Sequence, residues 1–67
     1  MMNSKKKRYS LSEVIEFIET SMVENTASIQ EENLYIDYKY NNDYIDTKKY
    51  LPVINKAIRK MDSYYNS

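Results

Sequence analysis

The sequence predicts a small α+β domain in which a helix, a short helix or loop, a β-hairpin and a closing helix follow one another. Two apolar stripes with three- and four-residue spacing, one after Ser10 and one around Pro52, indicate the two helices. Between them, residues 34–46 are rich in tyrosine and isoleucine, which favour strands. A chain of 67 residues has room for one domain, which we place at residues 10–67.

Residues 1–9 are predicted to form a basic, flexible arm ahead of this domain. Four of the ten basic residues of the chain lie in the arm: Lys5, Lys6, Lys7 and Arg8. The rest of the chain has six bases and ten acids, so the domain itself is mildly acidic. Such an arm can contact phosphate groups, or it can serve only as a solubilising tail.

The first helix is predicted to begin after Ser10, because Ser10 and Glu13 have the spacing of a capping box. Its apolar positions recur at helical spacing: Leu11, Val14, Ile15, Ile18 and Met22, with Phe17 at the edge of the stripe. Its end is predicted at residues 20–21 or at residues 24–25.

Residues 25–33 leave two alternatives open. Asn25, Thr26 or Ser28 caps a short second helix that holds Ile29, or the whole segment is a polar loop.

Residues 34–40 and 44–46 are predicted to pair as the two strands of a hairpin. Asn41 and Asn42 would form its turn, since asparagine tolerates positive φ. One face of the hairpin is assigned to the core: Leu34, Ile36, Tyr38, Tyr40 and Ile45. The other face carries Tyr35, Asp37, Lys39, Tyr44 and Asp46.

The closing helix is predicted to start after Asp46 and Thr47, either of which can cap it, with Pro52 in its first turn. Its apolar stripe consists of Tyr50, Ile54, Ala57, Met61 and Tyr64. This stripe belongs to the core or, alternatively, pairs two copies of the chain. A basic outer face is expected from Lys56, Arg59 and Lys60.

Several chemistries are excluded by composition, because the chain has no histidine, cysteine or glycine. Zinc fingers and Ser-His-Asp or Cys-His nucleophile systems need the first two, and phosphate-cradling loops need glycine. We therefore expect a binding protein and not an enzyme, with no cofactor, metal or small-molecule substrate. No apolar run approaches the roughly 20 residues of a membrane span, and none follows the basic start as in a signal peptide. A cytoplasmic location is expected.

From Tyr9 to Ile54 the chain resembles the small winged-helix excisionase and MerR-type helix-turn-helix proteins. The segment Tyr9–Glu13 is similar to the start of their first helix, and residues 20–33 have the length of a turn and a second helix. Asn41–Asn42 stands where the tip of the wing would lie, and Tyr44–Ile45 leads toward a closing helix. The resemblance implies a DNA-binding regulator or recombination factor. The residue usage, which favours AT-rich codons, indicates a low-GC bacterium or its phages and mobile elements.

On this interpretation, the bases of the arm and a few polar residues of the domain would contact DNA. The nucleic-acid-binding candidates are Lys5, Lys6, Lys7, Arg8, Asn25, Gln30, Lys39, Lys48 and Lys49.

The alternative interpretation is a phage-encoded inhibitor that binds a host protein through an acidic, tyrosine-rich hairpin. Tyrosine is common in protein interfaces, and regularly spaced carboxylates can imitate DNA phosphates. The protein-binding candidates are Glu31, Glu32, Tyr35, Asp37, Tyr44 and Asp46. A homodimer is expected in either case, since a domain of this size buries little surface alone.

Overall fold

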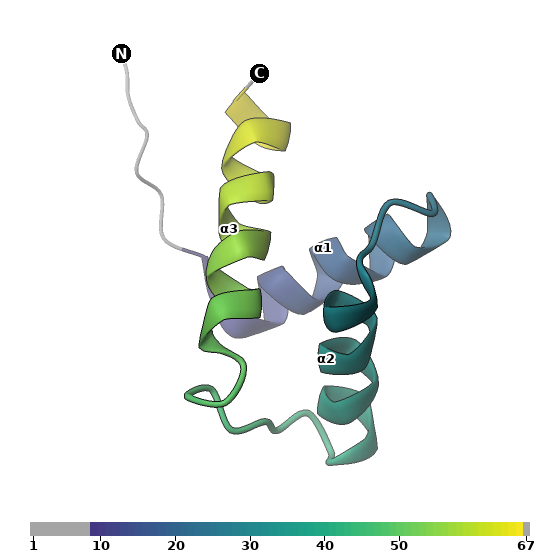
Figure 1. Ribbon diagram of the computed structural model, residues 1–67, viewed down its shortest axis with the longest axis vertical. Helices are drawn as coiled ribbons and strands as arrows, with labels where there is room; N and C mark the ends of the chain where they lie inside the picture. Colours follow the sequence, from purple (N-terminus) through teal and green to yellow (C-terminus); the bar gives the residue numbers. More distant parts are fainter. Residues whose placement is uncertain (1–8, 67) are drawn as a thin grey trace.

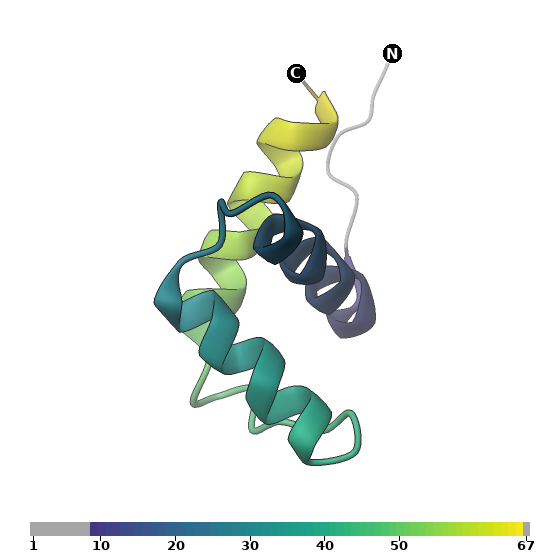
Figure 2. The same cartoon turned by 90° about the vertical axis from the view of Figure 1, so that its right-hand side faces the viewer.

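The computed structural model describes residues 9–66, which form three helices (Figure 1). These are α1 (Leu11–Val23), α2 (Ile29–Tyr40) and α3 (Leu51–Asn66). Each helix packs against the other two. In Figures 1 and 2, α1 lies across α3, and α2 leads away from the level of the first turns of α3 at a steep angle to it. No helix in this part of the chain is long and apolar enough to cross a bilayer.

The start of α1 is as the sequence predicts. The Glu13 backbone N–H donates to the Ser10 hydroxyl at 3.2 Å, and the Ser10 backbone N–H donates to the Glu13 carboxylate at 2.8 Å. These two bonds make a capping box. The helix ends at Val23, at the later of the two predicted positions, and Asn25 takes a left-handed φ of 62° in the turn that follows.

The structure decides between the two alternatives for residues 25–33 in favour of a helix. Ser28 caps α2, because its hydroxyl accepts from the Glu31 N–H at 3.1 Å and the Glu31 carboxylate accepts from the Ser28 N–H at 2.9 Å. This is a second capping box, and it starts a helix of 12 residues rather than a short one.

The predicted β-hairpin is wrong, and so is the α+β fold class, since residues 9–66 contain no strand. Residues 34–40 continue α2 to Tyr40. The strand preference of tyrosine and isoleucine is a weak local tendency. It is outweighed here by the Ser28 cap and by the burial of Leu34 and Tyr38, which are four residues apart and share one helical face.

The predicted turn is at the right place but has another role. Asn42 and Asp43 have φ values of 58° and 66°, so they reverse the chain at the end of α2 instead of joining two strands. Residues 44–46, predicted as the second strand, are irregular. Ile45 still enters the core, as predicted.

The closing helix is confirmed, although it starts at Leu51, three or four residues later than a cap at Thr47 or Asp46 predicts. The Asp46 carboxylate accepts from the Lys48 N–H at 3.1 Å, so it caps the turn at residues 47–50. Pro52 lies in the first turn of α3, where a missing N–H costs nothing.

One core joins the three helices and Ile45. Its buried hydrophobic members are Val14, Ile15, Phe17, Ile18, Leu34, Tyr38, Ile45, Ala57 and Met61. Tyr50 and Ile54 pack against it, so most of the α3 stripe is intramolecular and is not a free face for a second copy.

Candidate functional site

Helix α2 has apolar side chains on two opposite faces. Leu34 and Tyr38 point into the core. The opposite face carries Ile29, Asn33, Ile36 and Tyr40 at steps of four, three and four residues, which places them in one row along the helix. We call this row the outer ridge.

The outer ridge is largely open to solvent. Ile29 is 73% exposed, Ile36 57% and Tyr40 85%. The sequence pattern predicts Ile36 and Tyr40 in the core, and this prediction is wrong. In a strand, residues 34, 36, 38 and 40 share a face, whereas in a helix residues 36 and 40 lie opposite residues 34 and 38. The change from strand to helix therefore moves both side chains to the surface.

Charged side chains flank the outer ridge along one edge. Glu32 lies near its beginning and Lys39 near its end, both exposed. The ammonium group of Lys39 is 3.9 Å from the Asp43 carboxylate and lies over the rings of Tyr35 and Tyr38. Because half of its side chain is exposed, Lys39 can turn to another acidic partner.

Three of the predicted protein-binding residues make contacts within the fold. Glu31 is 1% exposed and holds Lys60 of α3. The Asp37 carboxylate accepts from the Tyr50 hydroxyl at 2.7 Å and from the Asn41 side chain at 2.7 Å. Tyr35 is half-buried against the core. These residues connect α2 to the rest of the fold.

The other three predicted protein-binding residues are exposed: Glu32, Tyr44 and Asp46. Glu32 lies on α2 and the other two follow it in the loop, so they do not form the acidic hairpin face that the sequence predicted. Two signals in the sequence point to this arrangement. The spacing from Ser28 to Glu31 repeats that from Ser10 to Glu13, and the 4-3-4 spacing of the outer ridge is helical.

The predicted nucleic-acid contacts are scattered over the molecule. Asn25 lies in the α1–α2 turn, Gln30 on α2, and Lys48 and Lys49 in the turn before α3. All are exposed, and Lys49 lies 5.5 Å from the Tyr50 ring centroid. Lys5, Lys6, Lys7 and Arg8 lie outside the described residues. The described candidates do not converge on one face of one element.

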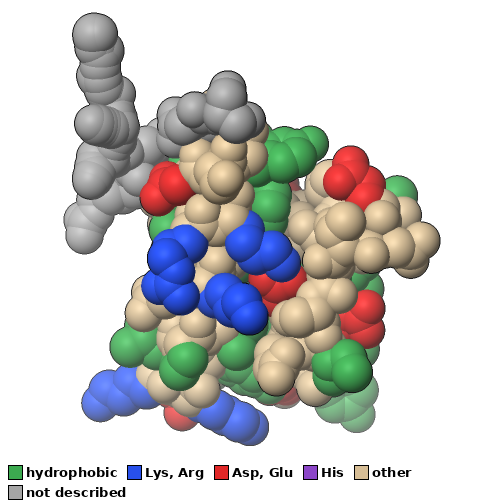
Figure 3. All heavy atoms as spheres, turned by 45° about the horizontal axis from the view of Figure 1, so that its top comes forward, with side chains coloured by type: hydrophobic (Ala, Val, Ile, Leu, Met, Phe, Trp, Pro, Cys, Tyr) green, Lys and Arg blue, Asp and Glu red, His purple; other side chains and the backbone are tan. Residues whose placement is uncertain are grey.

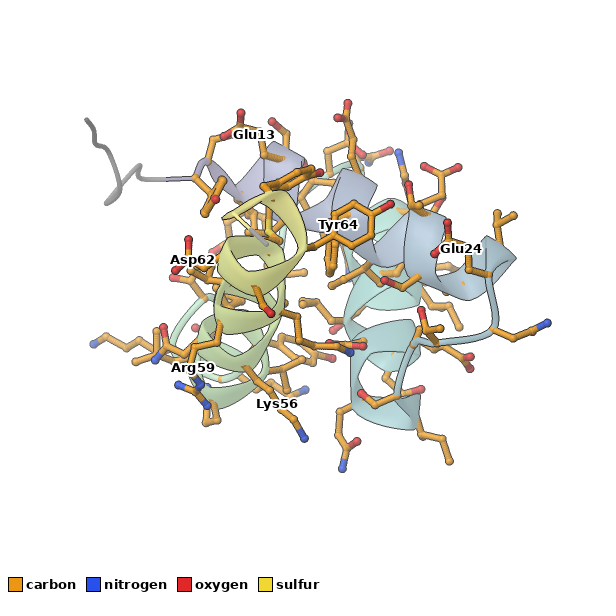
Figure 4. The ribbon with its side chains drawn as sticks, turned by 90° about the horizontal axis from the view of Figure 1, so that it is seen from above. Glu13, Glu24, Lys56, Arg59, Asp62 and Tyr64 are labelled. Carbon is orange, nitrogen blue, oxygen red and sulfur yellow. The ribbon has the colours of Figure 1, made fainter. Side chains whose placement is uncertain are left out.

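A compact basic surface occurs on α3 instead. Lys56, Arg59 and Lys60 share one side of the helix, and Figure 3 shows lysine and arginine side chains gathered on one face of the molecule. Lys60 is bound to Glu31, so Lys56 and Arg59 are its outward-facing members. In Figure 4 they point away from the side of the molecule on which Glu13 of α1 lies.

The junction of α1 and α3 holds an aromatic cluster. The Phe17 ring meets the rings of Tyr64 and Tyr65 edge-on, at centroid distances of 5.6 and 6.2 Å. The Tyr9 hydroxyl donates to the Asp62 carboxylate at 3.2 Å. Partial burial and this hydrogen bond raise the pKa of Tyr9.

Beside this cluster, α1 and α3 enclose a hollow whose rim includes Tyr64 and Glu24 (Figure 4). Its walls are mostly apolar. Among the residues described, no group of three or more acidic side chains is placed to hold a metal ion.

The comparisons with known proteins agree on the origin of the chain. Residues 10–58 match the family described as YonP prophage protein. Over 48 residues, the chain is 46% identical to the SPbeta prophage-derived uncharacterized protein YonP of Bacillus subtilis (strain 168), and the match covers 72% of this chain and 73% of that protein. No solved structure matches the chain. The resemblance to winged-helix excisionases finds no support, whereas the expected phage origin is confirmed. The chain belongs to the YonP prophage protein family.

Proposed function

We propose that this protein acts by binding another protein and not by catalysis, and that the outer ridge of α2 is its docking face. The observation that carries the proposal is the exposure of Ile29, Ile36 and Tyr40 in one row. A helix in a small soluble domain normally has one apolar face. In α2 the face with Leu34 and Tyr38 is already packed in the core, so the outer ridge is a second apolar face. Rows of apolar side chains at this spacing are how helices bind grooves and other helices.

The energetics support a partner. Fully covering a large apolar side chain is worth about 1.5–3 kcal/mol, so three of them can drive a specific association of moderate strength. The same side chains add little to the fold of the isolated chain, because more than half of each is exposed to solvent.

The family match includes this surface and leaves out the arm. The matched segment, residues 10–58, includes all of α2 and ends before Arg59. The arm bases Lys5–Arg8 lie outside it. For a phage-encoded protein, the occupant of this surface is a protein of the host or of the phage, a second copy of the chain included.

Site-specific photo-crosslinking tests the proposal. A benzophenone amino acid is placed at position 36 of the full chain, and at position 55 on the exposed side of α3 as the matched control. We expect a protein adduct from position 36 in cells of Bacillus subtilis, and its loss when Tyr40→Asp is added. Equal adducts from positions 36 and 55, or none from position 36, would contradict the proposal.

Nucleic-acid binding through α3 is the second candidate function, and the exposed pair Lys56 and Arg59 favours it. The test is fluorescence anisotropy with random-sequence duplex DNA at low and moderate salt. Salt-sensitive binding that Lys56→Ala and Arg59→Ala weaken would support it. Binding that is absent at low salt would exclude it.

A further inference from the structure

We infer that the partner on the outer ridge is a second copy of the chain, with the two α2 helices packed antiparallel. This inference rests on the proposed function, because it names the occupant of the same surface. Its basis is the order of side chains along α2 and along the edges of the ridge.

The row itself has the spacing of a coiled-coil seam. Ile29, Asn33, Ile36 and Tyr40 alternate steps of four and three residues, as the a and d positions of a heptad repeat do. A single asparagine among apolar seam positions fixes register and oligomeric state in coiled coils. In an antiparallel pair centred on the ridge, Ile29 lies opposite Tyr40 of the second copy. The two copies of Asn33 are then about 4.5 Å apart along the axis, where their amides can meet.

Charge decides the direction of the helices. Glu32 and Lys39 occupy equivalent positions, seven residues apart, on one edge of the ridge. In the antiparallel pair, Glu32 of each copy faces Lys39 of the other, with an offset of about 3 Å along the axis. Symmetry produces this attraction twice. In a parallel pair, Glu32 would face Asp37 of the second copy, and two like-charge contacts would result.

Lys39 is able to make this contact. Its present ion partner, Asp43, is 3.9 Å away in a solvent-exposed pair, which contributes little to stability. Turning toward Glu32 of the second copy would therefore cost the lysine little. The ridge is also free of intramolecular cover, because α1 and α3 both pack on the opposite side of α2.

The test is sedimentation velocity on the full chain over a wide concentration range. We expect reversible dimers whose dissociation constant rises about tenfold with Glu32→Lys or with Lys39→Glu, since each turns two attractive contacts into repulsive ones. The double variant with both changes should recover most of the affinity. Glu16→Lys on the outside of α1 makes the same change in net charge as Glu32→Lys and should leave the dimer unaffected. Far-UV circular dichroism confirms that each variant is folded.

Several outcomes would overturn the inference. One is a chain that stays monomeric at every concentration, and another is a dimer on which the charge swap has no effect. The mass of the adduct from position 36 distinguishes failure of the dimer from failure of the proposed function. An adduct of twice the chain mass supports the dimer. An adduct with a different protein, from a chain that is monomeric, overturns the dimer and leaves the proposed function standing. The absence of any adduct from position 36 would contradict both the dimer and the proposed function.

Discussion

The ammonium group of Lys60 donates to both carboxylate oxygens of Glu31, at 2.9 and 3.0 Å, and so connects the first turn of α2 to the middle of α3. The carboxylate is 1% exposed, whereas the lysine side chain is 35% exposed. The same carboxylate accepts from the Ser28 N–H in the capping box. One side chain therefore starts α2 and also attaches it to α3.

Removing the lysine should cost more than removing the acid. We expect Lys60→Met to lower the free energy of unfolding by about 2–3 kcal/mol, because it leaves a buried carboxylate without its cation. Glu31→Gln should cost about 1 kcal/mol, since glutamine can still accept in the capping box and Lys60 can reach water. The two changes together should cost less than their sum by at least about 1 kcal/mol in urea unfolding. Additive losses would show that the pair is not coupled.

The cap at the start of α2 should be measurable by itself. Ser28→Ala removes the acceptor for the Glu31 N–H and should cost about 1 kcal/mol. Thr47→Ala is a suitable comparison in an exposed turn, and we expect it to change stability by less than about 0.5 kcal/mol. Equal effects of the two changes in chemical unfolding would contradict the role of Ser28.

The two faces of α2 should respond differently to substitution. Leu34→Ala opens a cavity in the core and should cost about 2–5 kcal/mol of stability. Ile36→Lys, on the outer ridge, should change it by less than about 0.5 kcal/mol. The measurement is thermal unfolding at low protein concentration, where association contributes little. A large loss from Ile36→Lys in these conditions would mean that residue 36 is packed within the chain.

Alkaline pH should weaken the contact between Tyr50 and Asp37. The hydrogen bond to the Asp37 carboxylate, together with partial burial, raises the pKa of Tyr50 above the usual 10.0. Since the folded pKa is higher than the unfolded one, the neutral phenol stabilises the fold below pH 10. That contribution is lost as the pH rises through the folded pKa.

Urea unfolding from neutral pH to about pH 11 checks this expectation. Stability should fall at the alkaline end, and the fall should be smaller in Tyr50→Phe, which should also be less stable at neutral pH. Tyr9→Phe is the companion variant, because the pKa of Tyr9 is raised in the same direction. An unchanged alkaline profile in Tyr50→Phe would mean that the hydrogen bond to Asp37 adds no stability.

The sequence by itself determined the features that depend on near neighbours. The capping box of Ser10 and Glu13, the apolar stripe of α1, the place of Pro52 and the chain reversal at Asn42 all follow from local spacing and backbone preference. Composition likewise pointed to a binding protein of phage origin, and the origin is confirmed by the family match.

Only the tertiary structure decided the state of residues 34–40 and the identity of the candidate site. Their tyrosine and isoleucine residues fit a strand as well as a helix, so residue preference alone could not choose between the two. The choice came from burial of Leu34 and Tyr38 against α1 and α3, and from the bond between Glu31 and Lys60, which are 29 residues apart. Once the segment is helical, Glu31 turns inward while Ile36 and Tyr40 turn outward. The surface proposed for binding therefore exists because long-range packing, and not the sequence pattern alone, selected the helix.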